Sequence, residues 1–189
     1  MEAFLIACVV VAAAEMGDKT QLIALFLASR FRKPLPIILG ILLATLANHA
    51  APGLVGQWLG SVLSGPLLHG ILALSFFAAA SWAFIPDTIE ANPGSTVSHH
   101  GIFLTTSLTF FLTEIGDKTQ VATAALAAQL QAVGAVAMGT TVGMMAANVP
   151  VVLLSHAIAR KISLTRVRAL SGILFACLGL YEVSQMWQG

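Results

Sequence analysis

Charged residues are scarce in this sequence. Asp, Glu, Lys and Arg together make up 9% of its 189 residues, whereas 58% are hydrophobic. A soluble globular domain carries about 25% charged residues. Because a chain this poor in charge cannot cover a surface that faces water, the composition excludes an ordinary soluble domain and predicts an integral membrane protein surrounded by a lipid bilayer.

Other absences exclude further classes of protein. The two cysteines, Cys8 and Cys177, lie far apart in apolar segments and show no metal-binding spacing, so we expect them to act as small apolar side chains. The net charge is +1 and no run of basic residues exists, which gives no indication of a nucleic-acid partner. The HExxH motif of zinc proteases is missing.

Long apolar runs dominate what remains. A helix needs about 20 apolar residues to cross a bilayer core of ~30 Å, and the sequence contains six such runs. They cover residues 3–28, 35–58, 66–85, 101–127, 133–158 and 167–187. The runs are continuous rather than alternating, which favours helices over a β-barrel. We therefore predict an all-α membrane protein with six transmembrane helices.

Basic residues predict how these helices are oriented. Two of the nine Lys and Arg residues lie in the middle of apolar runs, and the other seven all fall in or directly beside the first and fifth connections. These seven are Arg30, Arg32, Lys33, Arg160, Lys161, Arg166 and Arg168. Because cytoplasmic loops are enriched in Lys and Arg, we expect these connections and the 86–100 loop in the cytoplasm, with both termini outside.

A seven-residue motif occurs twice. EMGDKTQ at 15–21 and EIGDKTQ at 114–120 match at six of seven positions, 99 residues apart. We therefore expect two three-helix repeats, residues 1–85 and 101–189, joined by a cytoplasmic linker at 86–100. Because three is odd, the second repeat must enter the membrane from the opposite side. Such inverted-topology repeats are typical of secondary transporters with a binding site near the midplane.

The motif places charged groups in the middle of two apolar runs. On a continuous helix Glu15 and Asp18 share one face, as do Glu114 and Asp117, because each pair is separated by three residues. A charge at the centre of a membrane helix costs about 2.5–3.5 kcal/mol on insertion scales. We therefore expect these groups to face one another, water or an ion. Their four carboxylates and two ammonium groups sum to a net charge of −2, which one divalent cation or two protons would neutralise.

Oxygen-bearing side chains around the motifs are suited to a hard cation such as Mg²⁺, Ca²⁺ or Mn²⁺. The predicted metal site consists of the four acids and nearby amides and hydroxyls: Glu15, Asp18, Glu114, Asp117, Asn48, Asn148, Gln21, Gln120, Thr20 and Thr119. Lys19 and Lys118 either balance the charge of the glutamates four residues before them or gate the site. Protons can occupy the same carboxylates when the metal leaves, which leads to the hypothesis of metal–proton antiport.

Three further ionisable residues are expected outside this site. His49 lies within the second run, where a packed or interfacial histidine is the expectation. His69 lies near the start of the third run, and Glu182 near the outer end of the sixth, where we expect it at the membrane interface.

The doubled motif resembles that of the Gdt-type cation exporter family, which carries two copies of E-φ-G-D-[KR]-[TS]. Residues 15–20 and 114–119 both fit this pattern fully, and the resemblance extends over essentially the whole chain. It implies export of Mn²⁺, or of Ca²⁺ in some members, in exchange for protons, with the motif acids as the cation site. The short form is similar to bacterial members, which implies the bacterial inner membrane.

The resemblance leaves two alternatives to this function. Asp18 and Asp117 can be interpreted as the dyad of an intramembrane aspartyl protease, and the site can also serve a different exported cation. On the transporter interpretation we expect no enzymatic activity and no cofactor, because the metal ion is the substrate. The sequence does not indicate the oligomeric state.

Overall fold

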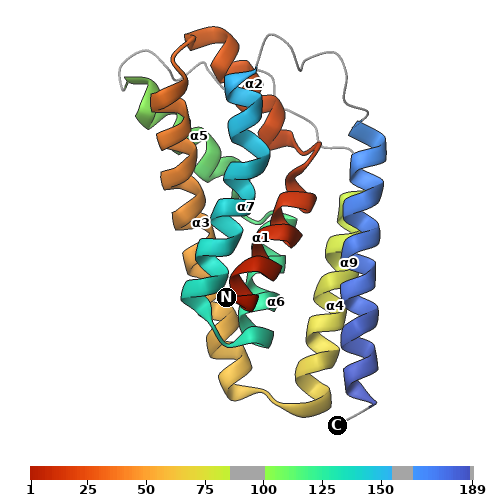
Figure 1. The fold of residues 1–189 in the computed structure, drawn as a ribbon. Coiled ribbons are helices and arrows are strands. Elements are labelled where there is room, and N and C mark those ends of the chain that lie inside the picture. The colour runs from red at the N-terminus through yellow and green to blue at the C-terminus, as the bar shows by residue number, and fades with distance from the viewer. Residues whose placement is uncertain (86–100, 155–163, 188–189) are drawn as a thin grey trace.

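The computed structural model describes residues 1–85, 101–154 and 164–187. Within these ranges all regular structure is helical. The helices are α1 (Glu2–Glu15), α2 (Lys19–Phe31), α3 (Pro34–Val62), α4 (Gly65–Ala83), α5 (Gly101–Glu114), α6 (Lys118–Leu130), α7 (Val133–Leu153) and α9 (Leu164–Met186) (Figure 1). The predicted linker at 86–100 and the end of the fifth predicted run lie outside the described residues.

Four of these helices are long and apolar enough to cross a membrane. They are α3, α4, α7 and, in α9, the stretch Ala169–Met186. Large apolar side chains such as Leu54 and Leu74 are exposed, while the acidic side chains of both motifs are buried. Soluble proteins show the opposite distribution of charge, so the fold is that of a multi-pass membrane protein.

The first and fourth predicted runs are not continuous helices, and this part of the prediction was wrong. Each run is interrupted inside its motif, at Gly17 and at Gly116, which both have a φ of 77°. Glycine adopts this left-handed conformation without steric cost, so the chain can turn there. The following residues, Asp18 and Asp117, are extended and form the N-caps of α2 and α6. The acids of a motif therefore lie on either side of a break rather than on one helical face.

The helices around the two breaks repeat closely. The bounds of α5 and α6 equal those of α1 and α2 displaced by 99 residues. Packing repeats as well, because α1 packs against α7 while α5 packs against α3. Gly139 of α7 lies directly against the carbonyl of Phe4, and Gly40 of α3 lies against that of Phe103. Gly139 is 99 positions after Gly40, and Phe103 is 99 positions after Phe4. The same glycine-to-carbonyl contact is therefore made around both copies of the motif.

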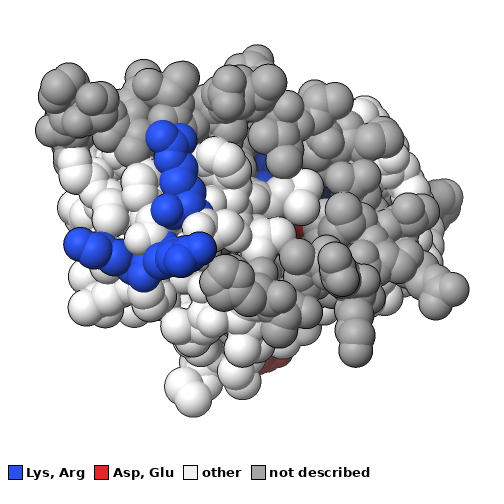
Figure 2. All heavy atoms as spheres, turned by 90° about the horizontal axis from the view of Figure 1, so that it is seen from above, with Lys and Arg blue, Asp and Glu red and all other residues white. Residues whose placement is uncertain are grey.

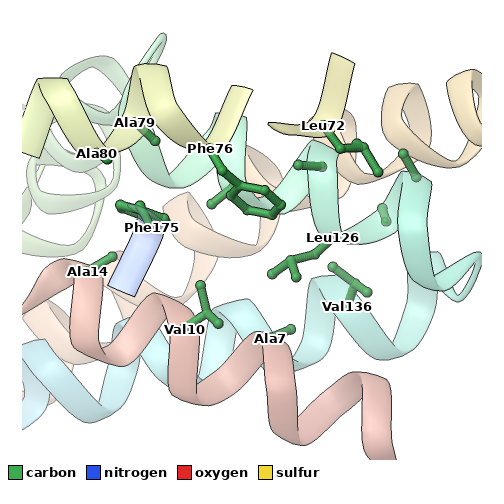
Figure 3. Packing of buried hydrophobic residues seen from close by; sticks show 14 residues of the cluster. Ala7, Val10, Ala14, Leu72, Phe76, Ala79, Ala80, Leu126, Val136 and Phe175 are labelled. Carbon is green, nitrogen blue, oxygen red and sulfur yellow. The ribbon is translucent and has the colours of Figure 1, made fainter. Parts of the chain in front are cut away.

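The helices α4 and α9 pack along each other on one side of the bundle (Figure 1). An apolar cluster joins this pair to the motif-bearing helices. In it Phe76 of α4 and Phe175 of α9, both fully buried, lie near Ala14 of α1 and Leu126 of α6 (Figure 3). The side chain of Ala14 is thus part of the apolar core, while the next residue, Glu15, belongs to the polar interior.

Basic side chains gather on one end of the molecule, the end seen from above in Figure 2. Arg30, Arg32 and Lys33 are exposed where α2 gives way to α3. The guanidinium of Arg30 lies 6.0 Å from the ring centre of Phe26 and 5.6 Å from that of Phe31. Arg160 and Lys161 lie outside the described residues, and the cytoplasmic location of this end stays a prediction.

Candidate cation-binding site

The two breaks meet inside the bundle and bring four carboxylates together. Glu15 ends α1 and Glu114 ends α5, while Asp18 and Asp117 precede α2 and α6. One carboxylate oxygen from each of the four lies within 4.8 Å of the others. The glutamates are 0% exposed and the aspartates 1%. Two segments 99 residues apart therefore build one buried acidic cluster, the four-acid site.

Each lysine of the motifs forms an ion pair with the aspartate of the other copy. The Lys19 ammonium lies 2.9 Å from Asp117 Oδ1, and the Lys118 ammonium contacts Asp18 Oδ1. The expected partners, the glutamates four residues earlier, were wrong because the break at the glycine removes the helical spacing on which that expectation depended. The two ion pairs link the motif copies to each other, and whether the lysines balance charge or gate the site stays a prediction.

The glutamates retain oxygen atoms that nothing in the described chain satisfies. The Thr20 hydroxyl donates to Glu15 Oε2 at 2.7 Å, and the Thr119 hydroxyl donates to Glu114 Oε2 at 3.3 Å. In the described residues, Oε1 of both glutamates is buried without a hydrogen-bond partner. A buried carboxylate oxygen without a partner is energetically costly. A cation between the two glutamates would remove this cost.

The glutamines of the motifs, Gln21 and Gln120, accept hydrogen bonds from the backbone at the helix breaks. Gln21 Oε1 accepts from the Gly17 amide at 2.8 Å, and Gln120 Oε1 accepts from the Gly116 amide at 3.0 Å. Their side-chain amides reach neighbouring helices, Gln21 to the Ala147 carbonyl at 2.9 Å and Gln120 to Asn48 Oδ1 at 3.2 Å. That Gln21 and Gln120 bind the ion stays a prediction. In this structure the side-chain carbonyl oxygen of each accepts a hydrogen bond from the backbone.

The two asparagines of the predicted metal site have different contacts. Asn48 donates to the Phe111 carbonyl at 3.1 Å, and its own oxygen accepts from Gln120. Asn148 donates to the Met144 carbonyl of its own helix at 3.1 Å. Within the described part of the chain, Asn148 Oδ1 is buried with no partner. Asn148 therefore offers a free oxygen, whereas the oxygen of Asn48 is already used.

His49 and Thr123 form a chain of hydrogen bonds that ends on the backbone carbonyl of Thr119. His49 is fully buried, as expected for a packed histidine, and its Nδ1 lies 2.9 Å from the Thr123 hydroxyl. That hydroxyl donates its proton to the Thr119 carbonyl at 2.7 Å, so the histidine ring must be the donor to Thr123. Thr123 is not among the residues that the sequence predicts for the site. Its position four residues after Thr119, one helical turn away, was the available signal.

Glu182, which is expected at the membrane interface, is buried against a neighbouring helix. Its side chain is 1% exposed and pairs with His69 at 2.8 Å between Nδ1 and Oε2. The tight packing of α9 against α4 covers the carboxylate. His69 is 113 residues away from Glu182 in the chain, so no local sequence pattern indicates that the two side chains pair.

The chain was compared with protein families and with individual proteins. The model of the family described as "Divalent cation/proton antiporter GDT1" matches residues 3–91 and 102–189. A protein of Vibrio cholerae named "Putative manganese exporter" is 45% identical over 181 residues, which cover 95% of this chain and 90% of the relative. The rice proteins named "GDT1-like protein 4", from the indica and japonica subspecies, are 26% identical over 92% of this chain and 70% of their own length.

No solved structure matches the chain. The family model covers nearly all of the sequence, each of its two matched segments contains one copy of the motif, and the Vibrio cholerae relative is similar over almost its whole length. The chain belongs to the GDT1 family of divalent cation/proton antiporters.

Proposed function

We propose that this protein exports Mn²⁺ in exchange for protons and that the four-acid site binds the ion. The observation that carries the proposal is the meeting of four buried carboxylates, from two distant motif copies, within 4.8 Å. Membership of a divalent cation/proton antiporter family supports the reaction. The relative named for manganese export supports Mn²⁺ as the metal.

The electrostatics of the site suit one divalent ion. Each lysine–aspartate pair is neutral as a whole, so the two glutamates account for the net charge of −2. Their free Oε1 atoms and Asn148 Oδ1 are buried acceptors of the hard type that Mn²⁺ and Ca²⁺ prefer. The aspartates and threonines complete the proposed ligand set. Protons on the same carboxylates also neutralise the charge, so that metal and protons exclude each other, as antiport requires.

The proposal includes six membrane crossings arranged as two inverted repeats. Helix α1 has 14 residues and α2 has 13. At 1.5 Å per residue the two helices placed end to end extend about 40 Å, which is enough to cross a bilayer core of ~30 Å. The same holds for α5 and α6. In Figure 1, α2 lies at one end of the bundle and α6 towards the other, as expected of inverted repeats. With the basic end in the cytoplasm, both termini lie outside the inner membrane.

Transport by the purified protein in liposomes tests the proposal. We expect a pH gradient to drive Mn²⁺ flux, with Ca²⁺ and Mg²⁺ added as competitors to rank the ions. Glu15→Gln and Glu114→Gln should abolish this flux because they remove the charges that the ion neutralises. Glu2→Gln is the matched control, since it makes the same change at an exposed position of α1. Normal flux in both site variants would refute the four-acid site.

The protease alternative has no support from the comparisons. Asp18 and Asp117 are each paired with a lysine, whereas the dyad of an aspartyl protease shares a proton between its carboxylates. An organic cation as the exported species fits the geometry less well, because the four carboxylates converge within the reach of a single small ion. Competition by organic cations for Mn²⁺ flux would revive that alternative.

A further inference from the structure

A second pair of ionisable side chains lies outside the four-acid site. His69 of α4 and Glu182 of α9 are 2.8 Å apart, between Nδ1 and Oε2. The Glu182 side chain is 1% exposed, and that of His69 is 28% exposed. Within the described ranges, Glu182 Oε1 is buried and has no hydrogen-bond partner.

Packing alone gives little reason for this pair. The contact between α4 and α9 is otherwise built from apolar and small side chains, among them Phe76, Phe175 and Gly179, the last lying against Phe77. A buried ion pair is on average no more stabilising than apolar residues of the same volume. A carboxylate with an unsatisfied oxygen adds a further cost. Ionisable groups kept inside membrane proteins at such a cost typically serve ion or proton pathways.

Few other ionisable groups lie on the helices packed around the pair. On α1 they are Glu2, Cys8 and Glu15; on α6, Lys118; and on α9, Cys177 and Tyr181, besides Arg166 and Arg168 in its first two turns, about 20 Å along the helix from Glu182. Among the described residues, neither His69 nor Glu182 forms an ion pair with any of these. A neutral imidazole beside a carboxylate has charge −1, and one added proton makes the pair neutral.

The pair lies at the end of the bundle opposite the basic face. His69 is four residues after the start of α4, and Glu182 is four residues before the end of α9, which is about 6 Å from either helix end. Both helix ends point downward in Figure 1, away from the end of α2. In the proposed orientation this is the outer side, from which an exporter exchanging metal for protons takes up its protons.

The pair also has a packing connection to the four-acid site. Phe76 is seven residues after His69 and Phe175 seven before Glu182, so both phenylalanines lie about 10 Å further into the membrane. Both pack in the cluster that contains Ala14, the neighbour of Glu15 (Figure 3). A change in how α4 and α9 pack therefore reaches the helix that carries the site.

We infer that His69 and Glu182 form a proton-binding site on the outer side, separate from the four-acid site, and that its protonation is part of the exchange cycle. The inference rests on the proposed function, because it assigns a site to the proton of that exchange. One proton from the outer solution binds to the imidazole or the carboxylate on each cycle, and it is released to the cytoplasm when the metal ion binds to the four-acid site from that side. No other group needs to change its covalent bonding.

Two modes of flux separate this role from a structural one. The full-length protein in liposomes is assayed for Mn²⁺–Mn²⁺ exchange at equal pH, which requires no net proton movement, and for Mn²⁺ flux driven by a pH gradient. We expect Glu182→Gln and His69→Gln to lower the driven flux at least tenfold and to keep exchange within twofold of wild type. Tyr181→Phe, an exposed change beside Glu182, is the control and should leave both modes unchanged.

Three outcomes would overturn the inference. Equal losses in both modes would mean that the pair only supports packing. Wild-type values in both modes would mean that protons bind at the four-acid site alone. A wild-type protein that carries Mn²⁺ in neither mode would refute the proposed function as well, which distinguishes that failure from the first two.

Discussion

Removing one lysine of the four-acid site should destabilise the protein by an amount that depends on which lysine is removed. Lys118→Met takes the ammonium away from Asp18, whose side chain is 1% exposed, while that of Lys118 is 6% exposed. Removing one partner of a buried ion pair costs about 3–5 kcal/mol. For a chain of this size 1 kcal/mol corresponds to about 2–4 °C in Tm. The expected loss for Lys118→Met is therefore about 6–20 °C.

Lys19→Met should have a smaller effect. The Lys19 side chain is 20% exposed, so its pair with Asp117 is more strongly screened and its loss more easily compensated by solvent. The double variant Lys118→Met with Asp18→Asn removes both charges and should recover most of the stability that the single variant loses. Double-mutant cycles of this kind isolate the interaction between the two partners.

Thermal unfolding of the purified protein in detergent, with a chelator present, measures these differences. The chelator is needed because a bound ion stabilises the protein and would mask the loss of a lysine. Equal Tm values for the two single variants would contradict the reasoning from burial. A double variant no more stable than Lys118→Met would show that the crossed pair is not the source of the effect.

Three further predictions use the same measurement of Tm. Gly116→Ala should cost about 1–2 kcal/mol and slow Mn²⁺ flux, because an L-residue is strained at a φ of 77°. Gly139→Ala should lower Tm, since its Cβ would meet the Phe4 carbonyl, whereas Gly134→Ala in the same helix has open space and should not. Mn²⁺ at 100 times its Kd should add about 2.7 kcal/mol, or about 5–11 °C. This gain should vanish in Glu114→Gln and weaken as pH falls, because protons compete for the carboxylates.

Much of the fold follows from hydropathy. The apolar runs at 35–58, 66–85 and 133–158 correspond to α3, α4 and α7, and the end of α7 is described to Leu153. Hydropathy did not predict the breaks at Gly17 and Gly116, since it measures how apolar a segment is and not how its backbone turns. A signal was present: glycine occupies the same place in both motif copies, and broken helices are the expected device at a transporter's binding site.

The convergence of the four acids was predictable from the cost of burying charge, but their pairing was not. Local spacing assigned Lys19 to Glu15, whereas the structure pairs it with Asp117. Which groups meet across two segments depends on how the helices pack, and a single sequence carries no record of that contact. The same reason explains why Glu182 and His69 were placed separately near the ends of their runs.

The two motif copies have nearly the same sequence but unequal surroundings. Gly60 of α3 lies against the carbonyl of Ala128 in α6, and Ala128 is 1% exposed. The residue at the same position of α2 is Ser29, which is exposed. The lysines show the same inequality, since Lys118 is 6% exposed and Lys19 is 20% exposed. In transporters built from inverted repeats, access alternates by movement of one repeat against the other around the fixed site. The acids of both copies are buried alike, so the inequality between the copies lies in the flanking helices α2 and α6 and not in the carboxylates.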